Sequence, residues 1–276
     1  MSNLLQRAAI ALTLGPLALY LIYRGGLFYF VPLALILLLA TAEYVHLIRR
    51  LDWLPSMAIM VGSSLLFYLS AEWGTTSTTS VLMVAALLIA MAYALWLYES
   101  REDGIALPSW LAMVAGIVLL GWLASHFFYL RGIETMAWQW TVLVIVSTWL
   151  ADSAAYVVGK FLAGRVLGKH QLSPRLSPNK TVEGYFGGVL LGTTFTVLAA
   201  YLLQLPLLVA AILGLLISVL GPIGDLGISL LKREAGQKDS GRTFGSHGGA
   251  LDRVDTLIWT VSIGFYLISY YYAYFS

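Results

Sequence analysis

The sequence contains no cysteine, and only 11% of its 276 residues are charged. Without cysteine the chain has no disulfide framework, no thiolate metal site and no thiol nucleophile. Soluble domains carry about 25% charged residues, so the scarcity of charge excludes an ordinary soluble domain. Apolar residues take its place, at 59% of the chain, and the mean hydropathy is +0.83. The composition therefore predicts an integral membrane protein.

Long apolar stretches predict an all-α, polytopic membrane protein, because a membrane-spanning helix needs about 20 apolar residues. We place nine expected spans at residues 8–23, 27–48, 54–72, 80–98, 108–130, 138–158, 184–204, 206–231 and 255–275. No small-residue cleavage site stands out near the first stretch, so we interpret it as a retained span. Most connections are short, but residues 159–183 and 232–254 form long polar loops.

The basic residues orient these spans in the membrane. With the N-terminus cytoplasmic, only Arg24 and Arg131 of the 16 lysines and arginines fall outside, which leaves 14 inside. This bias follows the positive-inside rule and predicts that both long loops are cytoplasmic and that the C-terminus lies outside. We expect an N-terminal apolar bundle of about five spans at 1–135 and a C-terminal catalytic membrane domain of about four spans at 136–276.

Few ionisable side chains fall inside the expected spans. We interpret Glu43 and His46, near the inner end of the second span, as reaching the interface or pairing with each other. Asp152 and Asp225 lie late in the sixth and eighth spans, where a carboxylate is either solvated at the surface or functional. A break or kink at Gly221-Pro222 is tolerated at membrane depth where it lines a wet cavity, so we expect Asp225 to face such a cavity.

The loop 159–183 contains five basic residues and two Ser-Pro pairs, and the prolines exclude a continuous helix. Two interpretations of its charge stay open. The loop can contact anionic lipid headgroups, or Arg175 and Lys180 can bind a phosphate group. In either case, Thr181 followed by Glu183-Gly184 is expected to begin the seventh span.

The polar segment 229–255 carries the chemistry. Asp252 and Asp255, spaced i, i+3, share one face of a predicted helix and can converge with Asp225 on the same side of the membrane. Oxygen-rich sites of this kind suit Mg²⁺, with phosphate oxygens as further ligands. Nearby cations and glycine-rich backbone can bind a polyphosphate. This combination is typical of phosphoryl or nucleotidyl transfer. The alternative is that the segment is only a solvated, charged connector between two spans.

Twelve residues of this segment also match a known signature. KREAGQKDSG followed by HGGALDRVD resembles the signature of the phosphatidate cytidylyltransferases, also called CDP-diacylglycerol synthases. The matching residues are Ser229, Lys232, Arg233, Lys238, Asp239, Gly241, His247, Gly248, Gly249, Asp252, Arg253 and Asp255. Upstream, Gly224-Asp225-Leu226, SPRLSPNKTVEG and Asp152-Ser153 resemble family segments too, so the resemblance covers roughly residues 145–260. Family members often have a glutamate where this chain has Ile228.

The resemblance implies a homodimeric, multi-pass enzyme of the inner (plasma) membrane with its active site facing the cytoplasm. Such an enzyme transfers the cytidylyl group of CTP to phosphatidate and releases CDP-diacylglycerol and pyrophosphate. Mg²⁺ is the expected cofactor, with room for a second cation, and no nucleic-acid partner is expected. The phosphate monoester has a second pKa of about 6, so the nucleophile is already ionised and needs no general base.

Each candidate residue has an expected role in that reaction. We expect a metal to be held by Asp225, Asp252 and Asp255. The expected catalytic residues are these three with Lys232 and Lys238. The expected substrate-binding residues are Asp152, Arg175, Lys180, Arg233, Asp239, His247, Gly248, Gly249 and Arg253.

Two rival functions remain. A CTP-dependent lipid kinase would need a base for a neutral hydroxyl, and Asp152 or Asp239 are the candidates. It would release free CDP, whereas a cytidylyltransferase labels the lipid. An ion-coupled transporter could use Asp152 and Asp225, but the polar residues crowd one face rather than the midplane and no inverted repeat is visible.

Overall fold

The computed structural model describes residues 15–166, 168–243, 245 and 248–275, and most of them are helical. A helix over residues 15–24 comes first. The further helices are α2 (Gly26–Arg49), α3 (Met57–Trp73), α4 (Thr76–Ser100), α5 (Ala106–Gly116), η1 (Ile117–Leu123), α6 (Ala124–Arg131), α7 (Ala137–Phe161), α8 (Val182–Leu202), α9 (Leu207–Glu234) and α10 (Leu251–Tyr274). Helix η1 is a π-helical segment that joins α5 to α6.

Six helices in the described part of the chain are long and apolar enough to cross a membrane. They are Gly26–Arg49, Ser77–Ser100, Ala106–Arg131, Ala137–Phe161, Val182–Leu202 and Leu207–Glu234. Large apolar side chains such as Val81, Leu190 and Leu208 are exposed on these helices, as contact with lipid requires. The helical membrane protein is therefore confirmed, while the count of nine spans stays a prediction, since α3 has only 17 residues.

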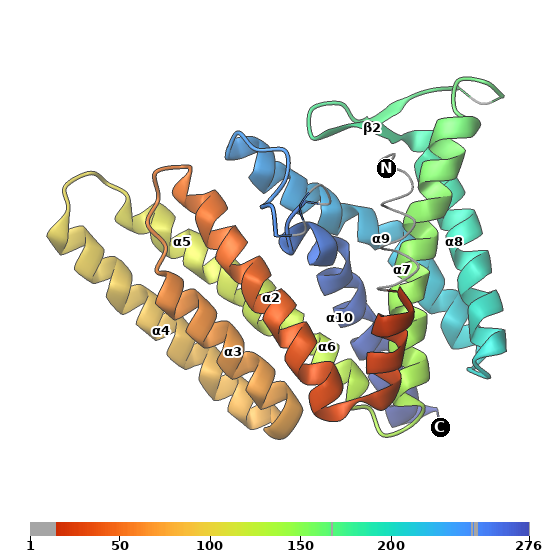
Figure 1. Cartoon of the computed structure of the whole chain (residues 1–276), viewed down its shortest axis with the longest axis horizontal. Helices are drawn as coiled ribbons and strands as arrows, with labels where there is room; N and C mark the ends of the chain where they lie inside the picture. The colour runs from red at the N-terminus through yellow and green to blue at the C-terminus, as the bar shows by residue number, and fades with distance from the viewer. Residues whose placement is uncertain (1–14, 167, 244, 246–247, 276) are drawn as a thin grey trace.

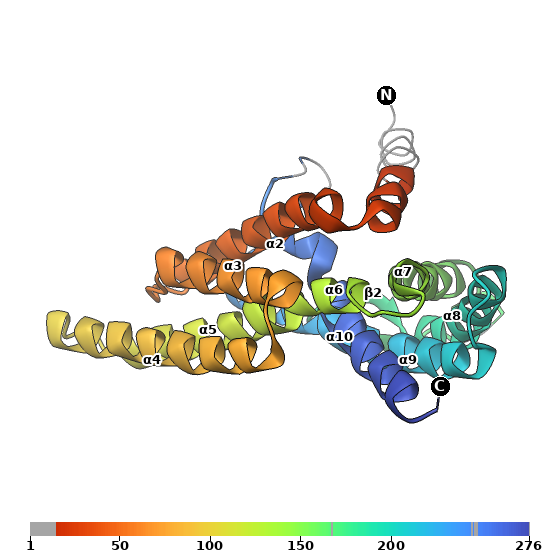
Figure 2. The same ribbon diagram turned by 90° about the horizontal axis from the view of Figure 1, so that it is seen from below.

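Helix α10 packs against helices from both halves of the chain. It contacts α2, η1 and α6 on one side and α7 and α9 on the other. Figure 1 shows α2 to α6 on the left, α7 to α9 on the right and α10 between them, and Figure 2 shows α10 between the same two groups from below. Segments near α10 can therefore come from either half.

Residues 171–181 form a β-hairpin, the exception to an otherwise helical fold in the described residues. Strand β1 (Gln171–Ser173) pairs antiparallel with β2 (Ser177–Thr181). Thr181 then caps α8, because its side chain accepts a hydrogen bond of 3.0 Å from the N–H of Gly184. This confirms that the Ser-Pro loop is not a helix and that a helix begins after Thr181. The hairpin and the α9–α10 connection lie at the same end of the molecule (Figure 1).

Helix α9 continues through Pro222 without interruption. Of the predicted break or kink before Asp225, the break is therefore wrong, and the kink stays a prediction. A proline inside a helix removes one backbone hydrogen bond, and here the flanking turns keep their helical geometry around that loss. Asp225 is held on a continuous helix and not on broken backbone.

Helices α7 and α8 approach closely along a row of glycines. Gly184, Gly188 and Gly192 lie four residues apart and so share one face of α8. A Cβ atom at Gly188 would lie 2.9 Å from the Cβ of Ala155, and one at Gly192 would lie 2.9 Å from the Cα of Ala151. Between helices in lipid, small residues allow the van der Waals contact that drives association. The glycine row therefore fixes α8, and with it the hairpin, against α7.

We expect Gly188→Leu to destabilise the protein, because the new side chain must push α8 away from α7. Overpacking of this kind costs roughly 1–3 kcal/mol. The measurement is the midpoint of thermal unfolding in detergent. Thr194→Leu is the matched control, because it places leucine on the exposed face of the same helix and should leave the midpoint unchanged. Equal midpoints for the two variants would contradict the packing described here.

Candidate active site

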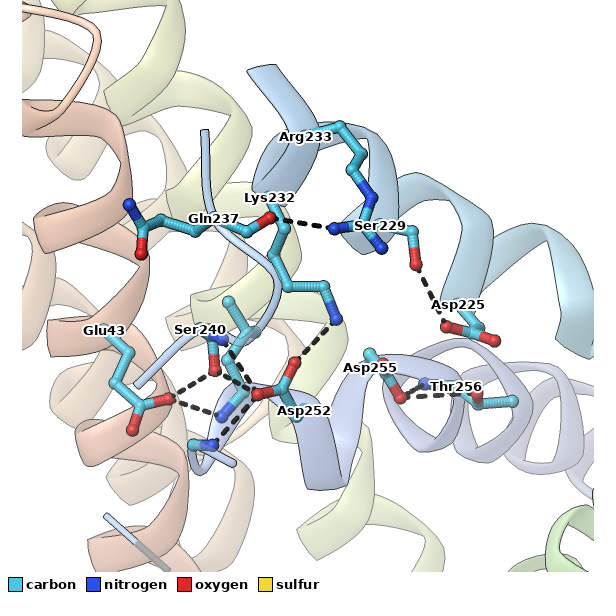
Figure 3. A network of polar contacts seen from close by, with 12 residues as sticks. Glu43, Asp225, Ser229, Lys232, Arg233, Gln237, Ser240, Asp252, Asp255 and Thr256 are labelled. Atoms are coloured by element: carbon cyan, nitrogen blue, oxygen red, sulfur yellow. Dashed lines mark hydrogen bonds and ion pairs between the residues drawn. The ribbon is translucent and has the colours of Figure 1, made fainter. Parts of the chain in front are cut away.

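Two carboxylates face each other across α9 and α10, as Figure 3 shows for Asp225 and Asp255. The charge of Asp225 acts on Asp255 and also on Asp152 of α7. Asp255 accepts a hydrogen bond of 2.7 Å from the N–H of Thr256, the next residue in its helix. Tertiary packing therefore gathers three acidic groups from three helices, although their sequence positions span about a hundred residues.

The hairpin reaches this site through Lys180. Its ammonium group donates to Asp225 Oδ2 in an ion pair, and its charge also acts on Asp152. Arg233, near the end of α9, donates to the carbonyl oxygen of Leu176 in the hairpin at 3.3 Å. These contacts close the hairpin over the end of α9. Of the two basic residues singled out in this loop, Lys180 is thus at the site and Arg175 is exposed.

Asp252 lies one turn from Asp255 but has a different environment. Its Oδ1 accepts from Lys232 Nζ at 2.6 Å, and both side chains are only 10% exposed. Its Oδ2 accepts from the N–H groups of Ser240 and Gly249, each at 2.9 Å. The carboxylate therefore joins the end of α9 to the α9–α10 connection (Figure 3). A charge this buried needs such partners, because an unpaired one is strongly destabilising.

Gly248 shows why this turn needs glycine. Its backbone has φ of +82°, a region that side-chain-bearing residues rarely adopt. A Cβ atom there would also lie 2.8 Å from Asp252 Oδ2. The left-handed turn at Gly248 brings the N–H of Gly249 to Asp252.

Glu43 of α2 is a site residue that the sequence prediction missed. It is buried, and it accepts hydrogen bonds from Ser240, Thr243 and the N–H of Leu251 in the α9–α10 connection. For Glu43 the predicted pairing with His46, or exposure at the interface, is therefore wrong, whereas His46 is exposed, as one of the two alternatives expected. The available signal was the cost of an acidic side chain in an apolar helix, which called for a buried partner.

A small cavity of about 20 Å³ lies among α7, α8, α9 and α10, lined by residues that include Asp152, Ser218, Pro222 and Thr256. It has room for about one water molecule. The hydroxyl of Ser218 is buried there without a hydrogen-bond partner among the described residues. This cavity lies beside Pro222 and is lined by Asp152 but not by Asp225, so a wet cavity facing Asp225 stays a prediction.

The other predicted residues lie around this centre at the surface. Lys238 and Asp239 are exposed in the α9–α10 connection, and Arg253 is exposed on the first turn of α10. His247 lies outside the described residues. The roles of these residues in substrate binding stay predictions.

The chemistry of the carboxylates fits Mg²⁺ held partly by substrate. No three Asp, Glu or His side chains between residues 15 and 275, where the structure describes them, gather closely enough to hold a metal by themselves. Mg²⁺ is commonly held by one or two carboxylates together with substrate phosphates. Asp225, which also accepts from Lys180 and Ser229, and Asp255 provide such a pair. The two oxygens of Asp252 are held instead by the buried Lys232 and by backbone N–H groups of the α9–α10 connection.

Fold and site together define a helical membrane protein with a carboxylate and lysine centre at one end of its bundle, suited to binding phosphates. Residues 5–271 match the model of the cytidylyltransferase family. The chain therefore belongs to the cytidylyltransferase family.

Two curated relatives resemble this chain over nearly its whole length, and a third over about half of it. A phosphatidate cytidylyltransferase of Synechocystis sp. is 31% identical over 280 residues, covering 91% of this chain and 92% of the relative. A phosphatidate cytidylyltransferase of Brucella melitensis is 34% identical over 266 residues, covering 94% of this chain and 90% of the relative. That of Bacillus subtilis is 34% identical over 154 residues, or 55% of each chain.

We expect Asp252→Asn to loosen the α9–α10 connection. Both oxygens of Asp252 accept hydrogen bonds, and the asparagine amide would place a donor nitrogen where one of them accepts. Breaking a buried ion pair costs roughly 3 kcal/mol, which corresponds to about a hundredfold larger open population. Tryptic cleavage after Lys238 or Arg242, both exposed, should speed up accordingly. Asp255→Asn is the control, since the contact of Asp255 with Thr256 lies within α10. A similar cleavage rate in both variants would refute the anchoring role of Asp252.

Proposed function

We propose that this chain transfers the cytidylyl group of CTP to phosphatidate, giving CDP-diacylglycerol and pyrophosphate, with a divalent metal ion at the cytoplasmic face of the membrane. Family membership and the names of the relatives that align over nine-tenths of the chain support the reaction. The observation that carries the site assignment is the meeting of Asp225 and Asp255 at one end of the apolar bundle (Figure 3), with Lys180 of the hairpin paired to Asp225.

The reaction joins two anions and needs no activated protein nucleophile. A phosphate oxygen of phosphatidate forms a bond to the α-phosphorus of CTP, and the bond from that phosphorus to the bridging oxygen of the β-phosphate breaks. The electron pair leaves with pyrophosphate. Since the attacking monoester is already ionised near pH 7, the protein's task is to bring the anions together and to stabilise the charge that moves to the leaving group.

The chain's residues divide this task. Asp225 and Asp255 would hold Mg²⁺, which when bound neutralises phosphate charge and orients the phosphates. Lys180, which pairs with Asp225, can turn to phosphate oxygens. Lys232 stays paired with Asp252 and adds positive charge near Asp255. Arg233 ties the hairpin to α9 and adds positive charge at the same end.

The membrane placement is part of the proposal. The two polar connections lie at one end of the molecule (Figure 1), and the basic residues of the sequence favour that end for the cytoplasm. The proposal includes nine spans, with the N-terminus in the cytoplasm and the C-terminus outside. Phosphatidate would reach the site sideways from the inner leaflet of the plasma membrane, and the enzyme would work as a homodimer.

Product analysis tests the reaction directly. Purified protein incubated with phosphatidate, Mg²⁺ and CTP labelled at the α-phosphate should move label into the lipid phase. Asp255→Asn should lower this transfer by roughly 100-fold or more, which is the usual effect of losing electrostatic stabilisation of a transition state. A chelator should abolish the transfer. Label released as free CDP would favour the lipid kinase. Robust transfer by Asp255→Asn would rule out the metal assignment.

Cysteine labelling tests the orientation, and the lack of native cysteine removes background. Asn179→Cys on the hairpin and Glu134→Cys between α6 and α7 are both at exposed positions. A membrane-impermeant maleimide should label Asn179→Cys only in inside-out vesicles and Glu134→Cys only in right-side-out vesicles. The reverse pattern would place the site on the external face, and the cysteine-free parent chain controls for nonspecific labelling.

A further inference from the structure

The carboxylate of Glu43 is surrounded by the α9–α10 connection, about 200 residues further along the chain (Figure 3). Ser240 Oγ lies 2.7 Å from Glu43 Oε2, the N–H of Leu251 lies 3.0 Å from the same oxygen, and Thr243 donates to Oε1. Two of these donors come from the middle of the connection, and the third comes from the first residue of α10. A single buried side chain of α2 therefore fixes the position of the connection at Ser240 and the position at which α10 begins.

Two glycines of the connection make room for this carboxylate. A Cβ atom at Gly241 would lie 2.4 Å from Glu43 Oε1, and one at Gly249 would lie 2.1 Å from Glu43 Oε2. Both distances are far below van der Waals contact. The sequence interpretation assigned glycine-rich backbone here to phosphate approach, whereas at these two positions the structure shows close packing against Glu43.

Ser240 links Glu43 to the anchored aspartate. Its hydroxyl lies 2.7 Å from Glu43 Oε2 and 3.0 Å from Asp252 Oδ2. A hydroxyl has one proton, so Ser240 donates to one carboxylate at a time and stays between them. Asp252 in turn pairs with Lys232. The chain of contacts thus runs from α2 through the connection to a lysine beside the proposed phosphate site.

We propose that Glu43 is a positioning residue for nucleotide binding, through which the N-terminal half of the chain sets the geometry of the α9–α10 connection and of Lys232. This inference rests on the proposed binding of CTP at that end of α9 and α10. Glu43 itself touches no reacting atom; it acts by holding Ser240 and, through Ser240, Asp252.

A positioning role and a merely structural role predict different kinetics. If Glu43 only stabilised the fold, its loss would reduce the amount of folded enzyme and lower kcat at unchanged KM. If Glu43 orders the phosphate-binding end, its loss raises the KM for CTP, because binding must then also order the connection. The KM for phosphatidate should change much less.

The first test compares Glu43→Gln with Glu43→Ala in steady-state assays on purified, folded protein. Glutamine keeps the shape and one acceptor oxygen, so Glu43→Gln should raise the KM for CTP by roughly threefold and Glu43→Ala by roughly tenfold, given the cost of orphaned buried donors. His46→Ala, on the same helix but exposed, should leave both KM values unchanged. Unchanged KM for CTP in both Glu43 variants, with an active wild type, would overturn the proposal.

The second test uses Gly241→Ala, whose new methyl group should displace the Glu43 carboxylate. Alone, this substitution should raise the KM for CTP to the level of Glu43→Ala. In the double variant Glu43→Ala/Gly241→Ala the methyl group has space, so the two effects should not add. Additive effects would contradict the contact. A wild type that transfers no label from CTP would instead refute the proposed reaction, which keeps the two failures distinct.

Discussion

The buried ion pair between Lys232 and Asp252 is the interaction on which the active-site end depends. The charges lie 2.6 Å apart and are almost shielded from solvent, so neither can lose its partner without a large cost in free energy. The pair holds α9 to the start of α10, and the second oxygen of Asp252 collects the N–H groups of Ser240 and Gly249. These bonds fix the α9–α10 connection at Ser240 and at Gly249.

Helix α10 extends this constraint to the whole molecule. Because it packs against α2, α6, α7 and α9, the residues on its first turns meet side chains from segments far apart in sequence. Glu43 of α2 accepts from the N–H of Leu251, and Asp225 of α9 lies near Asp255 (Figure 3). Lys180 of the hairpin joins this group through its ion pair with Asp225. The glycine row of α8 holds the hairpin in reach of this centre by fixing α8 against α7. The site is a product of helix packing and not of one motif.

Pairing of opposite charges is the common way in which this chain tolerates ionised groups next to apolar helices. Lys180 accompanies Asp225, and Lys232 accompanies Asp252. Glu43 instead accepts hydrogen bonds from two hydroxyls and one N–H. Partners of these kinds let Asp225, Asp252 and Glu43 lie close to apolar helices without being left unpaired.

The sequence by itself determined the helical membrane class, the two polar connections and the residues that form the signature, because these follow from local composition and spacing. It also placed the start of α8 at Thr181, a local cap. Only the tertiary structure decided that Glu43 joins the site, that Asp252 anchors a loop while Asp255 faces Asp225, and that α9 passes Pro222 unbroken. The physical reason is that buried polar groups are satisfied by partners from distant helices, which no local pattern specifies.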